Sequence, residues 1–169
     1  MRDLSTRTLD DHEPPGDGMV ELAPWGERAS AWMFDTLIVD LIAVAGMVLV
    51  LIANGTKAGS AVTAALMVLG LAVVAAAFIA LLYNQVWLQG STGQTWGKRR
   101  RGIALVRMSD LAPLGTGRAL GRFASRQLLT VVGAVVPVHL LSWLWPLWDQ
   151  ANRTWEDMLV GSVVVDVED

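Results

Sequence analysis

The sequence predicts an all-α integral membrane protein with three hydrophobic segments and a short strand pair on the cytoplasmic side. Of its 169 residues, 53% are hydrophobic and only 17% are charged. Segments at about 32–53, 61–88 and 127–148 each reach the roughly 20 apolar residues that are needed to cross a bilayer. The basic residues, by contrast, gather in one connecting segment, 89–126. We therefore expect a small multi-pass integral membrane protein.

The basic segment 89–126 sets the expected orientation. It carries eight Lys and Arg residues against one acid, Asp110, whereas the connection 54–60 holds only Lys57. Because positively charged loops stay on the cytoplasmic side, this loop and the N-terminus are expected inside. Residues 1–24 are polar and acidic and are predicted to form a disordered cytoplasmic tail. Residues 25–169 are then the membrane domain.

The first two hydrophobic segments are predicted to form an antiparallel hairpin, because only a short connection at Asn54-Gly55 separates them. Ala72, Ala76 and Ala80 recur every four residues on the second segment. Small residues at that spacing allow two membrane helices to approach closely. Gly46 on the first segment is expected to serve the same packing.

The third hydrophobic segment is interrupted by Gly133 and Pro137, which predict a kink or a break. A single kinked span would leave the C-terminus outside, whereas a re-entrant hairpin would return it to the cytoplasm. Strand-like runs at 102–107 and 161–169 bear on this choice, because a lone strand needs a partner for its backbone groups. Pairing of the two runs requires the re-entrant arrangement, which we favour.

Two carboxylates, Asp35 and Asp40, lie inside the first hydrophobic segment. A charged side chain at that depth costs roughly 2.5–3.5 kcal/mol on insertion scales and needs a partner, a polar cavity or a function. Arg28 and Asp35 are two turns apart and share a helix face, about 10 Å apart along the axis. Asp40 is rotated by about 140° from Asp35 and faces elsewhere.

The sequence offers little for catalysis. It has no cysteine and only two histidines, far apart in the chain. The run from Gly93 to Lys98 resembles a phosphate-binding loop, but its glycines are one residue too close and Arg99 stands where Ser or Thr is required. We therefore expect neither an enzyme nor a metal, cofactor or nucleic-acid site.

The basic residues are the candidate contacts to lipid. Three of them, at 118, 122 and 126, recur on one face of a predicted short helix. Cations near a membrane attract anionic headgroups by about 1 kcal/mol each, although basic side chains also snorkel without any specific lipid site. The residues expected to contact headgroups or a protein partner are Lys98, Arg99, Arg100, Arg101, Arg118, Arg122 and Arg126.

Three blocks of the sequence resemble the RDD family of bacterial multi-pass membrane proteins. They are Arg28-x6-Asp35, the Gly93-Gln-Thr-x-Gly-Lys-Arg run that continues to Val106, and the Arg153-Thr-Trp-Glu-Asp run that continues into the final valines. The blocks follow one another in the order that the family shows. The resemblance implies a membrane fold, and it suggests transport of unidentified ligands or exchange of monovalent cations for protons.

The family is named for one Arg and two Asp, which correspond to Arg28, Asp35 and Asp157. Asp40 lies outside the family pattern. The chain departs from the pattern at Glu156, where His is usual, and at 160–162, where Ala-Gly-Thr is usual.

Two functions remain open. In the first, the chain is a non-catalytic scaffold or assembly module, and Arg28, Asp35 and Asp157 form a buried ion network that fixes the helices. In the second, it is a transporter or transport subunit for monovalent cations, protons or another ligand, and Asp35 and Asp40 bind the ion. Three spans are few for a transporter, so this function predicts a homo-oligomer or a membrane-protein partner.

Overall fold

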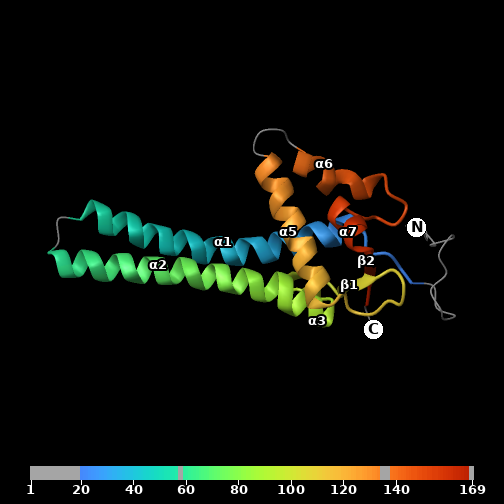
Figure 1. Ribbon diagram of the computed structural model, residues 1–169, viewed down its shortest axis with the longest axis horizontal. Helices are drawn as coiled ribbons and strands as arrows, with labels where there is room; N and C mark the ends of the chain where they lie inside the picture. Colours follow the sequence, from blue (N-terminus) through green and yellow to red (C-terminus); the bar gives the residue numbers. More distant parts are fainter. Residues whose placement is uncertain (1–19, 57–58, 134–137, 168–169) are drawn as a thin grey trace, which may run out of the picture.

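The computed structural model describes residues 20–56, 59–133 and 138–167. Its longest elements, α1 (Trp25–Gly55) and α2 (Ser60–Leu82), lie side by side as a hairpin, and the other elements gather at one end of it (Figure 1). We call the group of elements from α3 to β2 the head. The predicted hairpin is therefore present, and α1 begins seven residues before the predicted span at 32.

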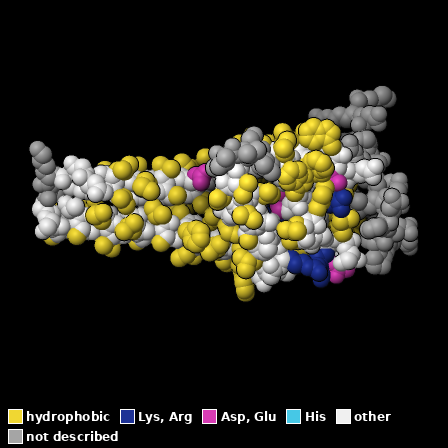
Figure 2. All heavy atoms as spheres, turned by 45° about the horizontal axis from the view of Figure 1, so that its top comes forward, with side chains coloured by type: hydrophobic (Ala, Val, Ile, Leu, Met, Phe, Trp, Pro, Cys, Tyr) yellow, Lys and Arg dark blue, Asp and Glu magenta, His cyan; other side chains and the backbone are white. Residues whose placement is uncertain are grey.

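Both hairpin helices are long and apolar enough to cross a membrane, which suggests a membrane location. On the face drawn in Figure 2, hydrophobic side chains cover the hairpin, and the basic side chains lie at the head. The two helices meet most closely at Gly46 and Gly70, where a Cβ on either residue would lie 2.8 Å from the other's carbonyl oxygen. The predicted alanine stripe does not make this contact, because Ala72 and Ala76 are exposed.

The second helix continues beyond the hairpin into the head without a break. α2 passes into a π-helix at Tyr83–Leu88 and then into α3 (Gln89–Thr92). A π-turn contains one more residue than an α-turn, and here it buries Asn84. The short α4 (Trp96–Arg100) follows and leads into β1 (Ile103–Arg107).

The predicted third span is not seen as one continuous helix. Its residues fall into the second half of α5 (Thr116–Gly133), into α6 (Val138–Leu144) and into a 3-10 turn at Trp145–Leu147. α5 begins inside the predicted basic loop and packs against the π-helix and α3, and α6 packs beside it (Figure 1). The expected break at Pro137 lies outside the described residues.

The predicted strand pair is confirmed. After α7 (Trp155–Val160), β2 (Ser162–Asp166) pairs antiparallel with β1, from Ile103 opposite Asp166 to Arg107 opposite Ser162. The chain thus returns from α6 to the end of the hairpin where β1 lies, as the re-entrant alternative requires.

The N-terminal approach to α1 also belongs to this sheet. Leu22 forms a bridge with Val165, and Ala23 N donates to Val164 O over 3.0 Å. Both residues are buried with the strand core. Residues 20–24 are therefore ordered and pack against the sheet of the head, whereas the remainder of the predicted disordered tail lies outside the described residues.

Candidate functional site

The centre of the head is a buried carboxylate, Asp157, held by two arginines. Arg122 Nε donates to Asp157 Oδ1 over 2.7 Å, and an Arg28 guanidinium nitrogen donates to Oδ2. Asp157 also closes the capping box of α7, because it accepts from Thr154 N over 3.1 Å. Its side chain is fully buried. This ion network ties together α1, α5 and α7, which are distant in the sequence.

A second, partly buried pair lies beside the first. Arg126 Nε donates to Glu156 Oε1 over 3.2 Å, and the Ser142 hydroxyl donates to Oε2. Ser142 Oγ in turn accepts from Trp155 N over 3.2 Å. Glu156 thus joins α5 to α6 and α7.

Asp35 does not join the arginines, although it shares a helix face with Arg28. Its Oδ1 accepts from Gly97 N over 2.8 Å and from Asn84 Nδ2 over 2.9 Å. Asn84 Oδ1 accepts from Trp96 N over 2.9 Å. Asp35 and Asn84 therefore satisfy two free N–H groups at the N-terminus of α4, where a negative charge is also favoured.

Two glycines of the second family block allow α4 to reach this position. A Cβ on Gly97 would lie 2.1 Å from Ala31 O, so α4 contacts the backbone of α1 directly. Gly93 ends α3 at φ +76, and a Cβ there would lie 2.8 Å from Leu105 O. The spacing of Gly93 and Gly97, which resembles that of a phosphate-binding loop, is thus explained by close backbone packing against β1 and α1.

The paired acids are held in their charged form. Burial alone would raise the pKa of Asp157, but the charges of Arg122 and Arg28 outweigh it and hold that pKa well below its usual range. The pKa of Glu156 is also lowered, because Arg126 and Arg122 outweigh the effect of burial. Neither group is suited to exchange protons near neutral pH.

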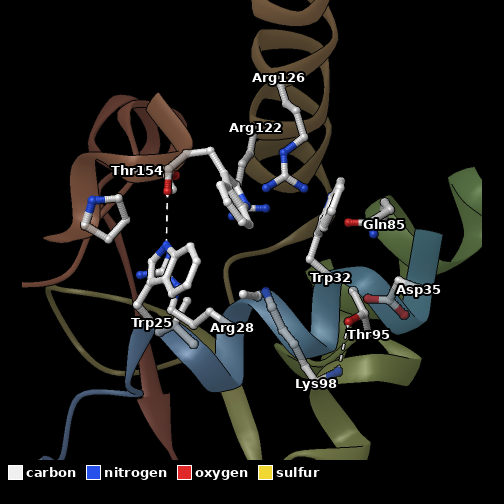
Figure 3. A pocket seen from close by; sticks show the side chains of 14 residues that line it. Trp25, Arg28, Trp32, Asp35, Gln85, Thr95, Lys98, Arg122, Arg126 and Thr154 are labelled. Carbon is white, nitrogen blue, oxygen red and sulfur yellow. Dashed lines mark hydrogen bonds between the residues drawn. The ribbon is translucent and has the colours of Figure 1, made fainter. Parts of the chain in front are cut away.

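Lys98 faces the same centre without an acid of its own. Figure 3 shows its side chain extending from α4 toward Arg122 and Arg126, in the space between Trp25 and Trp32. In the amide orientation that satisfies its neighbours, Gln89 accepts from Lys98 Nζ over 2.9 Å and from Arg122 over 3.3 Å. Burial and the charge of Arg122 hold the pKa of Lys98 well below its usual value.

These side chains surround a small cavity and border a larger groove. The cavity, of about 40 Å³, is lined by Arg28, Asp35, Lys98, Arg122 and Arg126 together with aromatic side chains. The groove, of about 550 Å³, runs between α1, the end of α2, α5 and α6. Cavity and groove share five lining residues, namely Trp32, Gln85, Arg122, Arg126 and Trp143.

Asp40 lies on the wall of the groove, away from the ion network. It is exposed, and it has neither a hydrogen bond nor an ion pair with any residue in the described part of the chain. Asp40 is thus the one predicted acid that the structure does not bring to the centre of the head.

The predicted basic set divides into two groups. Lys98, Arg122 and Arg126 turn inward, whereas the others lie at the surface, at positions 99, 100, 101 and 118. Arg100 lies over the ring of Phe34 at 5.1 Å, and Arg101 pairs with Glu27 at 3.7 Å. Headgroup contact by this outer group stays a prediction.

Sequence reasoning missed Asn84, Gln89 and Ser142. The signal for the first two was available, because each is a polar residue at the end of a long apolar run. Ser142 carried no comparable signal, because its partner Glu156 lies in another element. Among the described residues no group of three or more His, Cys, Asp or Glu side chains is arranged to hold a metal ion.

The structure thus defines a small helical protein with two membrane-length helices and a head held together by buried ion pairs. The RDD family model matches residues 22–161, which is most of the chain. The chain therefore belongs to the RDD family. Arg28, Asp35 and Asp157, the residues expected from the family name, all lie within the match. No curated protein and no solved structure matches the chain.

Proposed function

We propose that this protein is a non-catalytic scaffold or assembly module of the bacterial cytoplasmic membrane, with its head and N-terminus on the cytoplasmic side. The observation that supports the proposal is the pair of arginine contacts to Asp157. Both of its oxygens are bonded to arginines from different helices, so this acid holds the fold rather than a ligand.

The other acid of the family name is engaged in the same way. Asp35 is buried and caps α4, and Asn84 supports it from the π-helix. An ion-carrying site needs a group that can release its partner and take another. Arg28, Asp35 and Asp157 instead make contacts that fix the position of α1, α4 and α7.

The surface of the hairpin supports an assembly role. Leu41, Leu51, Val68, Leu71 and Ile79 are all more than half exposed along its length. Lipid covers such a face in a membrane, and a second copy of the chain or another membrane protein is the expected partner within it.

Transport is the second candidate, and one observation favours it. Asp40 is a carboxylate on a membrane-length helix, it has no partner among the described residues, and it borders a groove. Acids in such positions are typical of proton and ion pathways.

Exchange measurements in proteoliposomes separate the two candidates. The purified chain is reconstituted with a pH-sensitive dye inside, and Na⁺, K⁺ or Li⁺ is added outside. The scaffold proposal predicts no exchange above that of empty vesicles. Exchange that disappears in Asp40→Asn but persists in Asp110→Asn, a surface acid outside both helices, would overturn the scaffold proposal and support transport.

A further inference from the structure

The centre of the head contains more basic than acidic side chains. Arg28, Lys98, Arg122 and Arg126 line the small cavity, and the network supplies only Asp157 and Glu156 as ion-pair partners. Asp35, the one further acid on the wall, is engaged with backbone and amide donors of α4 and the π-helix. An anion in the cavity would offset this excess.

Lys98 is the cation with the least compensation. No carboxylate of the described chain lies within ion-pair distance of its ammonium group, and the repulsion of three nearby arginines outweighs the attraction of Asp157. Burial and the neighbouring arginines disfavour the charged form of this amine in the empty site. It becomes favourable when a ligand brings a negative charge within hydrogen-bonding distance.

The cavity opens onto an amphipathic groove. Val39, Leu81, Phe123, Leu129 and Leu140 supply apolar side chains along the groove, and Arg122 and Arg126 lie where it meets the cavity. Its volume of about 550 Å³ falls in the range of about 300–1,000 Å³ that is typical of small-molecule sites. A free inorganic anion would leave this apolar wall unused.

We propose that the cavity and the groove together bind one anionic phospholipid, with its phosphate at Lys98, Arg122 and Arg126 and an acyl chain along the groove. The two membrane-length helices place such a ligand within reach. The proposal rests on a membrane location, and it holds whether the protein is a scaffold or a transporter.

The test measures lipid binding to the purified full chain, freed of lipid in a neutral detergent. Phosphatidylglycerol and phosphatidylcholine are titrated separately, and bound lipid is counted by native mass spectrometry. We expect phosphatidylglycerol to bind about tenfold more tightly than phosphatidylcholine. The phosphates of both lipids can accept charge-assisted hydrogen bonds from the basic side chains. The positively charged choline group of phosphatidylcholine, however, is repelled by the same side chains. Equal binding of the two lipids would overturn the proposal.

Two variants separate the cavity from the basic surface. Lys98→Met removes a cavity cation, and Arg99→Gln removes the neighbouring exposed charge, which lines neither the cavity nor the groove. We expect about a tenfold loss of affinity for phosphatidylglycerol in the first and less than a twofold change in the second. Similar losses in both variants would indicate general attraction to a basic surface and would contradict the site.

Two further measurements test whether the ligand is an anion and whether it is a lipid rather than free phosphate. Asp40→Asn removes a negative charge from the groove wall, so it should leave phosphatidylglycerol affinity unchanged or raise it, and a loss would indicate a cationic ligand. Inorganic phosphate should not compete at concentrations where the lipid binds. Full competition by phosphate would show a free-anion site and would overturn the lipid assignment.

Discussion

Replacing Asp157 by Asn should be the most damaging single change of charge in the molecule. Asn retains an oxygen that can accept from Thr154 N, so the cap of α7 is largely kept. It removes the negative charge that Arg122 and Arg28 share in a fully buried position. Breaking one side of a buried ion pair typically costs about 3–5 kcal/mol, which is a large share of an ordinary stability of about 5–15 kcal/mol.

Thermal unfolding in detergent, followed by intrinsic tryptophan fluorescence, measures this loss. For a chain of this size, 3–5 kcal/mol corresponds to a fall in Tm of roughly 6–20 °C. Asp110→Asn is the matched control, because Asp110 pairs with Arg107 at 2.9 Å but is exposed, and a surface pair contributes about 0–1 kcal/mol. If both variants lose the same small amount, the network does not hold the head and the reasoning fails.

Two further predictions concern the same head. Because the pKa values of Asp157 and Glu156 are lowered in the folded protein, their stabilisation is complete above the unfolded values of 3.8 and 4.5 and is lost progressively as the pH falls below them. Unfolding midpoints between pH 7 and pH 3 should fall less steeply in Asp157→Asn than in the wild type, and parallel curves would contradict the assignment. Gly97→Ala should lower stability by about 1–3 kcal/mol or more, because its Cβ would collide with Ala31 O. Gly26→Ala, whose Cβ meets nothing within 4 Å, should be neutral or stabilising in the same denaturation assay.

The hairpin and the strand pair could be predicted because their signals are local or nearly so. Two long apolar runs around Asn54-Gly55 leave few alternatives to an antiparallel pair. The pairing of the two strands could be predicted because each strand needs a partner for its backbone groups, and each was the only candidate partner of the other. The register of the strand pair could not be predicted, because the consecutive valines at 163–165 can pair in several alignments.

The third segment shows where hydropathy stops being informative. A window average counts the apolar residues of 127–148. It cannot show that α5 starts at Thr116, or that Arg122 and Arg126 pair with acids 35 and 30 residues away. Those pairs turn the basic face of α5 inward. From the sequence alone, the arginines at 118, 122 and 126 are therefore interpreted as a lipid-facing surface. Only the position of α7 shows that two of them pair with acids.

The charges without an opposite partner are the ones to examine for function. Lys98 among arginines and Asp40 on an apolar wall each lower the stability of the empty protein, whereas Arg28, Asp35 and Asp157 raise it through their contacts. Neutral substitution should therefore stabilise at both of the first two sites, with a higher Tm for Lys98→Met and for Asp40→Asn in ligand-free detergent. A residue that holds the fold cannot give this result, so a fall in Tm at either site would mark that charge as structural. A rise at both sites would identify the groove and its cavity as the part of the molecule in which stability is sacrificed to binding.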